Sequence, residues 1–412
     1  MMRALLVSGL VVALAAESSA RAEQSLLDAE HGGLALGGYA LTLGGLQRLD
    51  FDLGPGAPEP PPADHLGLSA SVLRLEWKAA LGEHVTAELH QRGFLRVSSE
   101  ALGGEKLGLG ASAVPQRTVD LRSVAYDDER LLLEHDVDRL AVHAGLGDFD
   151  VTLGRQAITW GLAALFRVAD LWTTFSPFEL DTSQKRGIDA LRLLYSHSRT
   201  LEIEGVVADR GTLRDLSAGL RVVGYFSSLD AHLALAKQWR EIIAFAGVSA
   251  IAGSFKLRAE AAGPYDLDGA ELLRPRGTAG VDWFHGSGAV TLEAHYNGAG
   301  VAHAADYVGH LTTSPVFARG ESYFLGRWYA GAAATWKVSE LLQIAVTALG
   351  NLRDPSAVLA ASVAYQISQE TSLSLGAFQG IGKTAIIAAA PEMRSEFGAM
   401  GGLYYLSLSA FF

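Results

Sequence analysis

The chain has 412 residues, no cysteine and a formal net charge of −12. The lack of cysteine excludes a disulfide framework, and an acidic chain without a basic tract is a poor candidate for binding nucleic acid. The mean hydropathy is +0.19. Yet beyond the first 22 residues no apolar run reaches the 18 residues of a transmembrane helix, and the longest candidate, 242–253, is a dozen long.

A positive mean hydropathy without helical spans leaves one other membrane architecture. In lipid every backbone N–H and C=O must be bonded internally, and only helices and closed β-barrels satisfy that condition. We therefore expect an all-β chain that forms a transmembrane, antiparallel up-and-down β-barrel.

Residues 1–22 have the layout of a secretory signal peptide. Arg3 is a short basic start, residues 4–16 are apolar, and Ala-Arg-Ala at 20–22 is a cleavage site. The alternative is an N-terminal membrane anchor, although the apolar part is too short to span a bilayer. We expect export through the Sec pathway and one domain at 23–412. Cleavage removes two arginines and one glutamate from 33 basic and 45 acidic residues, which leaves a net charge of −13.

Polar and apolar residues then alternate along most of the chain, in segments of about ten residues, the length of a tilted transmembrane strand. In 254–261, for example, one face is apolar and the other carries Lys256, Arg258 and Glu260. The pattern predicts eighteen strands, at 34–46, 67–79, 84–97, 137–145, 149–157, 187–196, 200–208, 214–224, 229–239, 243–250, 254–262, 276–285, 288–298, 326–337, 341–350, 355–366, 371–380 and 400–412.

Alternation alone is also compatible with a soluble β-sandwich, whose charged face would meet water. Long strands and aromatic residues near strand ends favour the barrel instead. Trp328 and Trp336 lie eight residues apart on one predicted strand, a spacing that places them at opposite lipid interfaces. The alternative is that both are ordinary core tryptophans, since aromatic residues dominate protein cores as well.

The predicted connections differ in length on the two sides of the barrel. Those after even-numbered strands are short, whereas the long ones follow odd-numbered strands: 47–66, 98–136, 158–186, 263–275, 299–325 and 381–399. Short turns at one end and long loops at the other are typical of outer-membrane barrels. Because 98–136 has strand-like pieces that could add a hairpin, sixteen or twenty strands stay open.

Three stretches within 137–196 stand out: LGRQAITWG (153–161), ADLW (169–172) and KRGIDALRL (185–193). They resemble a pattern shared by porin-like outer-membrane proteins of Gram-negative bacteria, including families similar to alginate-export barrels. The resemblance implies a lumenal strand followed by a loop that folds back into the pore. Alginate exporters are expected to have an arginine-dominated lumen, whereas this chain interleaves acidic and basic residues.

The long connection at 158–186 also attracts attention without the resemblance. At 29 residues it exceeds an ordinary connection, and it is too apolar for a disordered segment. We expect it to pack on the lumen wall and narrow the pore; the alternative is a cap over the outer rim. Acidic residues there are expected to act on ion selectivity. The candidate constriction residues are Arg155, Gln156, Trp160, Arg167, Asp170, Glu179 and Asp181.

Charged residues on the polar strand faces are candidates for the pore wall, where charge and width set selectivity. For each of them the alternative is a salt bridge that merely ties neighbouring strands together. The candidates are Arg74, Glu76, Lys78, Glu88, His90, Arg92, Glu202, Glu204, Lys256, Arg258, Glu260, Asp282, Glu293 and His295.

The chain ends on LYYLSLSAFF, an alternating strand without a polar tail. In a closed barrel this strand pairs with the first one and has no free edge. A terminal phenylalanine after alternating apolar residues resembles the signal that outer-membrane barrels present to their assembly machinery. The residues that carry this assembly signal are Tyr404, Leu406, Leu408 and Phe412.

The sequence predicts a channel for small hydrophilic solutes or ions in a Gram-negative outer membrane, in contact with lipid and lipopolysaccharide. No enzyme activity, cofactor or metal is expected, because HExxH and GxSxG patterns are absent and the segments 380–384 and 265–271 depart from phosphate and calcium loops. A homo-oligomer is left open. The alternatives are a polysaccharide export conduit, an outer-membrane enzyme and a plugged structural barrel.

Overall fold

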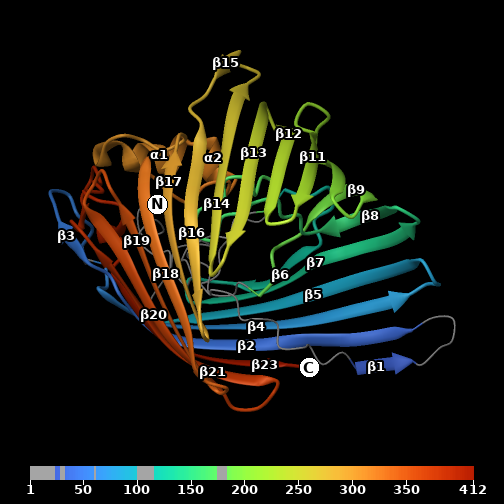
Figure 1. Cartoon of the computed structure of the whole chain (residues 1–412). Helices are drawn as coiled ribbons and strands as arrows, with labels where there is room; N and C mark the ends of the chain where they lie inside the picture. The colour runs from blue at the N-terminus through green and yellow to red at the C-terminus, as the bar shows by residue number, and fades with distance from the viewer. Residues whose placement is uncertain (1–23, 28–32, 60–61, 100–115, 174–182) are drawn as a thin grey trace.

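A computed structural model describes residues 24–27, 33–59, 62–99, 116–173 and 183–412. Its main feature is a closed antiparallel β-barrel of eighteen strands, each paired with its neighbours along the chain (Figure 1). The strands are β2 (Leu34–Arg48), β4 (His65–Ala80), β5 (Val85–Ser98), β7 (Leu131–Leu146), β8 (Phe149–Gln156), β9 (Ile188–Ser198), β10 (Leu201–Ala208), β11 (Ser217–Phe226), β12 (Leu229–Gln238), β13 (Glu241–Ala252), β14 (Phe255–Asp266), β16 (Arg276–His285), β17 (Gly288–Asn297), β18 (Trp328–Ser339), β19 (Leu342–Asn351), β20 (Ser356–Gln366), β21 (Thr371–Ile381) and β23 (Gly402–Phe411).

The eighteen predicted strands are confirmed, and the fold class with them. The count is eighteen because the described residues of the doubtful stretch, 98–99 and 116–136, add no hairpin to the barrel wall. Instead β7 begins at Leu131, six residues earlier than expected, and the short strand β6 (Arg122–Asp127) pairs with its first residues. β6 pairs with residues 132–136 of β7, on the same edge of β7 that pairs with β8 at residues 140–146.

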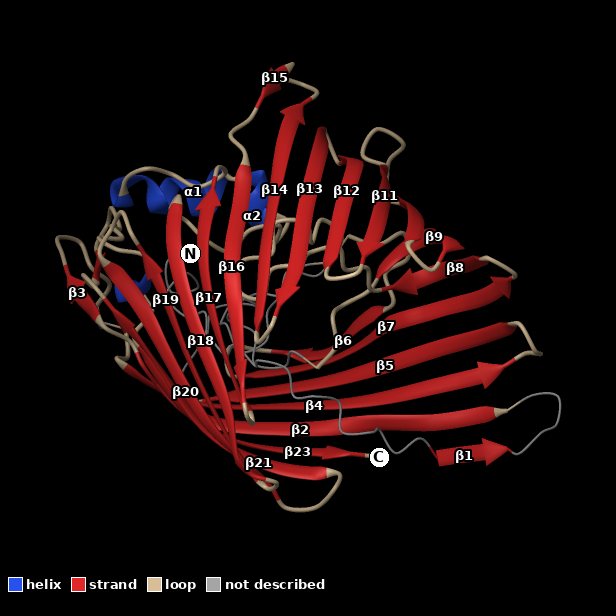
Figure 2. Cartoon of the chain, in the orientation of Figure 1, coloured by secondary structure: helices blue, strands red, loops and turns tan. Residues whose placement is uncertain are grey.

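The remaining elements lie in the connections, mostly on the side of the long ones. They are β1 (Gln24–Leu27), which pairs with the start of β2, β3 (Phe51–Leu53), β15 (Glu271–Leu272), β22 (Ala385–Ile387), the helices α1 (Tyr307–Thr313) and α2 (Pro315–Ala318), and two 3₁₀ turns at Ala304–Asp306 and Phe397–Ala399. Figure 2 shows how little helix there is beside the strands. No helix in the described part of the chain is long and apolar enough to cross a membrane.

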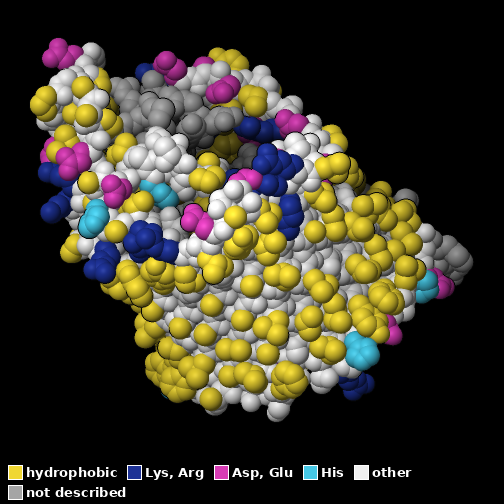
Figure 3. Space-filling model, turned by 90° about the horizontal axis from the view of Figure 1, so that it is seen from above, with side chains coloured by type: hydrophobic (Ala, Val, Ile, Leu, Met, Phe, Trp, Pro, Cys, Tyr) yellow, Lys and Arg dark blue, Asp and Glu magenta, His cyan; other side chains and the backbone are white. Residues whose placement is uncertain are grey.

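The burial pattern of the strands is that of a barrel in lipid, inverted relative to a soluble protein. On the outside, large apolar side chains such as Leu233, Leu257 and Leu375 are at least half exposed. Many charged residues on the opposite face are buried. Hydrophobic side chains cover a broad area of the outer wall in Figure 3. The side chains of Trp328 and Trp336 are both about half exposed and lie near opposite ends of β18. Their placement fits two interfacial belts better than a core.

The seam between β2 and β23 closes the barrel. It runs in register from Arg48–Gly402 to Tyr39–Phe411. Beyond it, the Phe412 N–H donates to the Gly38 carbonyl at 3.0 Å and the Gly38 N–H to the Phe412 carbonyl at 2.9 Å. The last strand therefore has no free edge, as the sequence predicted.

Removal of Phe411 and Phe412 is expected to prevent stable closure, because it deletes the last seam hydrogen bonds and the packing of Phe411 on Tyr39 at 5.6 Å between ring centroids. The truncated chain should lose the faster gel migration that an unboiled folded barrel shows in detergent. Truncated protein that still fractionates with the outer membrane and keeps this heat-dependent shift would contradict the prediction.

Candidate functional site

The connection between β8 and β9 turns inward and lies against the barrel wall. Six backbone N–H groups, those of residues 162–166 and of residue 168, donate to two carboxylates of the wall. Glu260 accepts from Leu162 at 2.7 Å, from Ala163 at 3.3 Å and from Val168. We call residues 158–173 the inner segment. Its inward course satisfies backbone donors that would otherwise need water.

The second carboxylate is Glu293 on β17. It accepts the N–H groups of Ala164, Leu165 and Phe166 at 2.7–3.0 Å and pairs with Arg258 at 3.1 Å. Bonds from backbone amides to an ionised carboxylate are stronger than neutral ones. Glu260 and Glu293 therefore fix the inner segment to β14 and β17.

Apolar contacts hold the inner segment as well. Phe166 stacks on His295 with ring centroids 5.0 Å apart and lies 5.1 Å from Phe324. Trp160 and Trp172, near the two ends of the segment, meet edge to face at 5.2 Å between ring centroids. These contacts explain why a connection this apolar packs inside the barrel and not in water.

Asp170 holds the base of the inner segment together. Its side chain is fully buried and accepts the N–H groups of Trp160 and Gly161 at 3.1 Å. It also pairs with Lys185 at 2.5 Å and with Arg167 at 3.8 Å. Asp170 was expected to act on ion selectivity; in the structure its side chain is buried and its oxygens are bound by these partners.

A cavity of about 570 Å³ borders the inner segment. Among the described residues, the charged ones that line it are all basic: Arg139, Arg167, Lys185 and Arg258. Apart from Leu162, the remaining described lining is small or polar and includes Thr159, Gly161, Ala163, Ser183 and Gln184.

Three of these cations pair with carboxylates that are not among the lining residues. Asp170 serves Lys185 and Arg167, while Arg258 is held by Glu293 and by Asp282 at 2.5 Å. Burial lowers the pKa of Lys185, although Asp170 opposes that shift. The described part of the cavity lining thus presents positive charge to its contents.

Two other predicted constriction residues, Arg155 and Gln156, form hydrogen bonds that tie neighbouring segments together. Arg155 donates to Asp189 at 2.8 Å and to the carbonyls of Val137 and Val119, and Gln156 donates to the Ala190 carbonyl at 3.1 Å. Among the described constriction candidates, only Arg167 lines the cavity. Glu179 and Asp181 lie outside the described residues.

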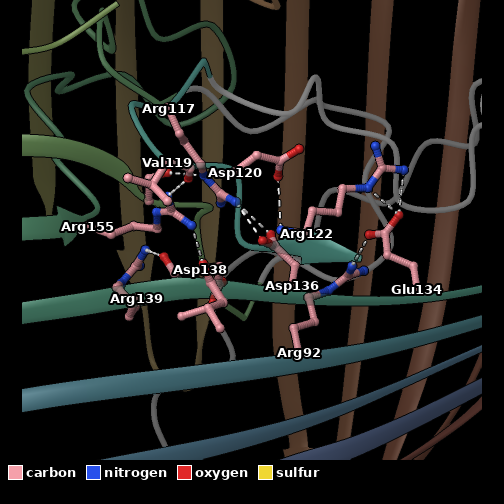
Figure 4. A network of polar contacts seen from close by, with 12 residues as sticks. Arg92, Arg117, Val119, Asp120, Arg122, Glu134, Asp136, Asp138, Arg139 and Arg155 are labelled. Carbon is pink, nitrogen blue, oxygen red and sulfur yellow. Dashed lines mark hydrogen bonds and ion pairs between the residues drawn. The ribbon is translucent and has the colours of Figure 1, made fainter. Parts of the chain in front are cut away.

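A second segment, residues 116–127, enters the barrel beside β7 and forms the polar network of Figure 4. Arg117 binds both oxygens of Asp136, at 2.7 and 2.9 Å, and Arg122 donates to Glu134 at 2.8 Å. The sequence showed only ambiguous strand-like and helix-like pieces here. The alternating arginines and carboxylates were the available signal, but their partners lie on other segments.

The fourteen predicted wall residues all lie on the inner strand faces by the alternation, and nine of them are buried. Many of these are paired, so the salt-bridge alternative describes them well. Arg74 pairs with Asp138 at 2.7 Å and with Glu76 at 3.0 Å, and Glu204 pairs with Arg192 at 2.6 Å. The less buried members are Lys78, Glu88, Glu202, Lys256 and Arg258.

No protein-family model and no curated protein matches this chain. Solved structures do match in fold. A BenF-like porin from Pseudomonas fluorescens Pf-5 has a TM-score of 0.55 at 11% identity, over 92% of this chain and 98% of that one. OccAB2 of Acinetobacter baumannii has 0.54 at 9%, over 92% and 98%. OccK5 (OpdH) of Pseudomonas aeruginosa has 0.54 at 9%, over 91% and 97%.

At these identities the likeness establishes the barrel fold. It supports the porin-like resemblance drawn from the sequence and gives no support to the alginate-export one.

Proposed function

We propose that this protein is a porin-like channel of a Gram-negative outer membrane that passes small hydrophilic solutes and prefers anions. The observation that carries the proposal is the cavity beside the inner segment, whose charged lining is entirely basic within the described residues. An eighteen-stranded barrel is wide enough for water and solutes unless segments fold into it. Charge at such a narrowing acts more strongly than in bulk water.

The apolar outer wall supports a lipid environment, with lipopolysaccharide against its outer half. The signal-peptide layout of residues 1–22 supports delivery by the Sec pathway, and the closed seam supports insertion by the barrel assembly machinery. The solved porins named above share the fold with this chain, and the proposal extends the role of a porin to it. Assembly into a homo-oligomer is not part of the proposal.

The test is single-channel recording in planar bilayers, with the reversal potential measured across a potassium chloride gradient. Wild-type protein should conduct and favour chloride. A plugged structural barrel would give no conductance at all, and a cation-selective channel would contradict the role assigned to the basic lining.

Arg167→Gln should lower the preference for chloride. Its side chain is one-third exposed and lines the cavity, and among the described residues it is bound only to the Ala163 carbonyl at 3.2 Å and to Asp170 at 3.8 Å. Its neutralisation removes lumenal charge with little structural loss. Arg48→Gln is the matched control, since Arg48 is an exposed arginine at the end of β2. Equal reversal potentials for wild type and Arg167→Gln would count against the proposal.

A further inference from the structure

At the end of the barrel that carries the long loops, a buried carboxylate joins its own connection to a second connection and to two strands. Glu396, in the connection between β21 and β23, accepts hydrogen bonds from the Leu325 N–H at 2.9 Å, the Tyr329 hydroxyl at 2.6 Å and the Asn351 amide at 2.7 Å. These donors belong to the 298–327 connection, to β18 and to β19.

The groups that face Glu396 carry no positive charge. Asp354, in the turn between β19 and β20, accepts the Glu396 N–H at 2.8 Å and the Ser356 hydroxyl at 2.6 Å. Tyr307 of α1 accepts from Asn351 at 2.9 Å. No cation among the described residues forms an ion pair with Glu396 or Asp354. Ionisation of Glu396 therefore places a buried negative charge beside a second carboxyl group.

An unbroken series of ring contacts leads from this cluster to the inner segment. The ring of Tyr329 lies 4.8 Å from that of Phe324, which lies 5.1 Å from that of Phe166. Phe166 is the residue whose N–H is bound by Glu293 at the cavity wall. Leu325, which Glu396 holds directly, follows Phe324 in the chain. Movement of residues 323–326 would therefore remove one of the rings on which Phe166 packs.

We propose that Glu396 is a positioning residue whose protonation docks the 298–327 connection onto the inner segment, and whose ionisation releases it. The inference rests on the proposed channel function only for its effect on conductance; the docking itself is a property of the fold. The carboxyl group of Glu396 can control this docking because it binds both Leu325 and Tyr329 and has no cation beside it among the described residues to balance its charge.

The direction of the effect follows from burial. Complete burial raises the pKa of Glu396 to about 7, from the ordinary value of 4.5, although its three donors oppose the shift. Burial also raises the pKa of Asp354. A raised pKa in the docked state means that docking is strongest below pH 4.5 and is lost as the pH rises through 7. Between pH 5.5 and 8.5 this linkage weakens docking on the order of 30-fold.

The direct test is hydrogen–deuterium exchange of the Leu325 amide in the full-length barrel in detergent or bilayers, after correction for the intrinsic pH dependence of exchange. Protection in the wild type should fall by on the order of 30-fold between pH 5.5 and 8.5. Glu396→Gln copies the neutral form and should keep its protection at both pH values. Glu392→Gln is the matched control, since Glu392 is an exposed glutamate of the same connection.

Single-channel recording provides the second readout. Wild-type conductance should rise with pH around a midpoint near 7, and Glu396→Gln should stay at the low-pH level. If Glu396→Gln retains the wild-type pH profile, lumenal histidines control it and the inference is overturned. Leu325 protection that is independent of pH overturns it as well. A barrel that conducts nothing at any pH refutes the proposed function alone, because exchange still tests the docking.

Discussion

Replacing residues 162–168 with two glycines is expected to raise single-channel conductance several-fold. These residues occupy space inside the barrel, and their removal leaves only the eighteen-stranded wall and the remaining inward segments to limit the pore. The shortened chain can close because the ends of the excised piece are adjacent: Gly161 lies against Arg167, and Asp170 binds the Gly161 N–H at 3.1 Å.

Two further variants separate pore width from general damage. Shortening the exposed tip at 268–270, between β14 and β15, should leave conductance unchanged, since that tip lies outside the lumen. Glu260→Gln combined with Glu293→Gln keeps the chain length but weakens the hold on six backbone N–H groups, and should give larger current fluctuations. Folded protein is confirmed first by heat-dependent gel migration. An excised variant that folds but conducts like the wild type would show that these residues do not set the width.

Leu375→Arg is expected to reduce the free energy of folding in bilayers by about 2–4 kcal/mol, the cost of arginine on the lipid face near the midplane. Leu375 is well exposed on the outer face of β21, opposite Val363 and Leu406, which are also outward. An arginine there has no partner and faces hydrocarbon.

Ser374→Arg provides the matched control one residue away. Ser374 lies on the inner face, opposite Ala364 and Ser407, whose small side chains leave room for arginine in a polar lumen. The two variants carry the same added charge on the same strand and differ only in the face. Refolding in lipid vesicles across a denaturant series measures both, and equal costs for the two would show that the faces are misassigned.

The sequence by itself determined the wall of this protein. Alternation has a period of two residues and is a local property, so β14, with Lys256, Arg258 and Glu260 on one face, could be recognised without knowing its neighbours. The same holds for the strand count, for the difference between short and long connections, and for the seam at Phe412. In a barrel each strand pairs with the next along the chain, so that locating the strands also gives the topology.

Only the tertiary structure decided which charges face the cavity. Glu260 and Glu293 looked like two wall carboxylates among many, but they bind backbone N–H groups 92 to 129 positions away in the chain. In the sequence Asp170 was a candidate selectivity residue, but in the structure its side chain is buried against its partners. Arg139 and Lys185 line the cavity although neither stood out among the candidates. Periodicity specifies the face on which a side chain lies; the partner that it meets across the lumen depends on how distant segments fold inward.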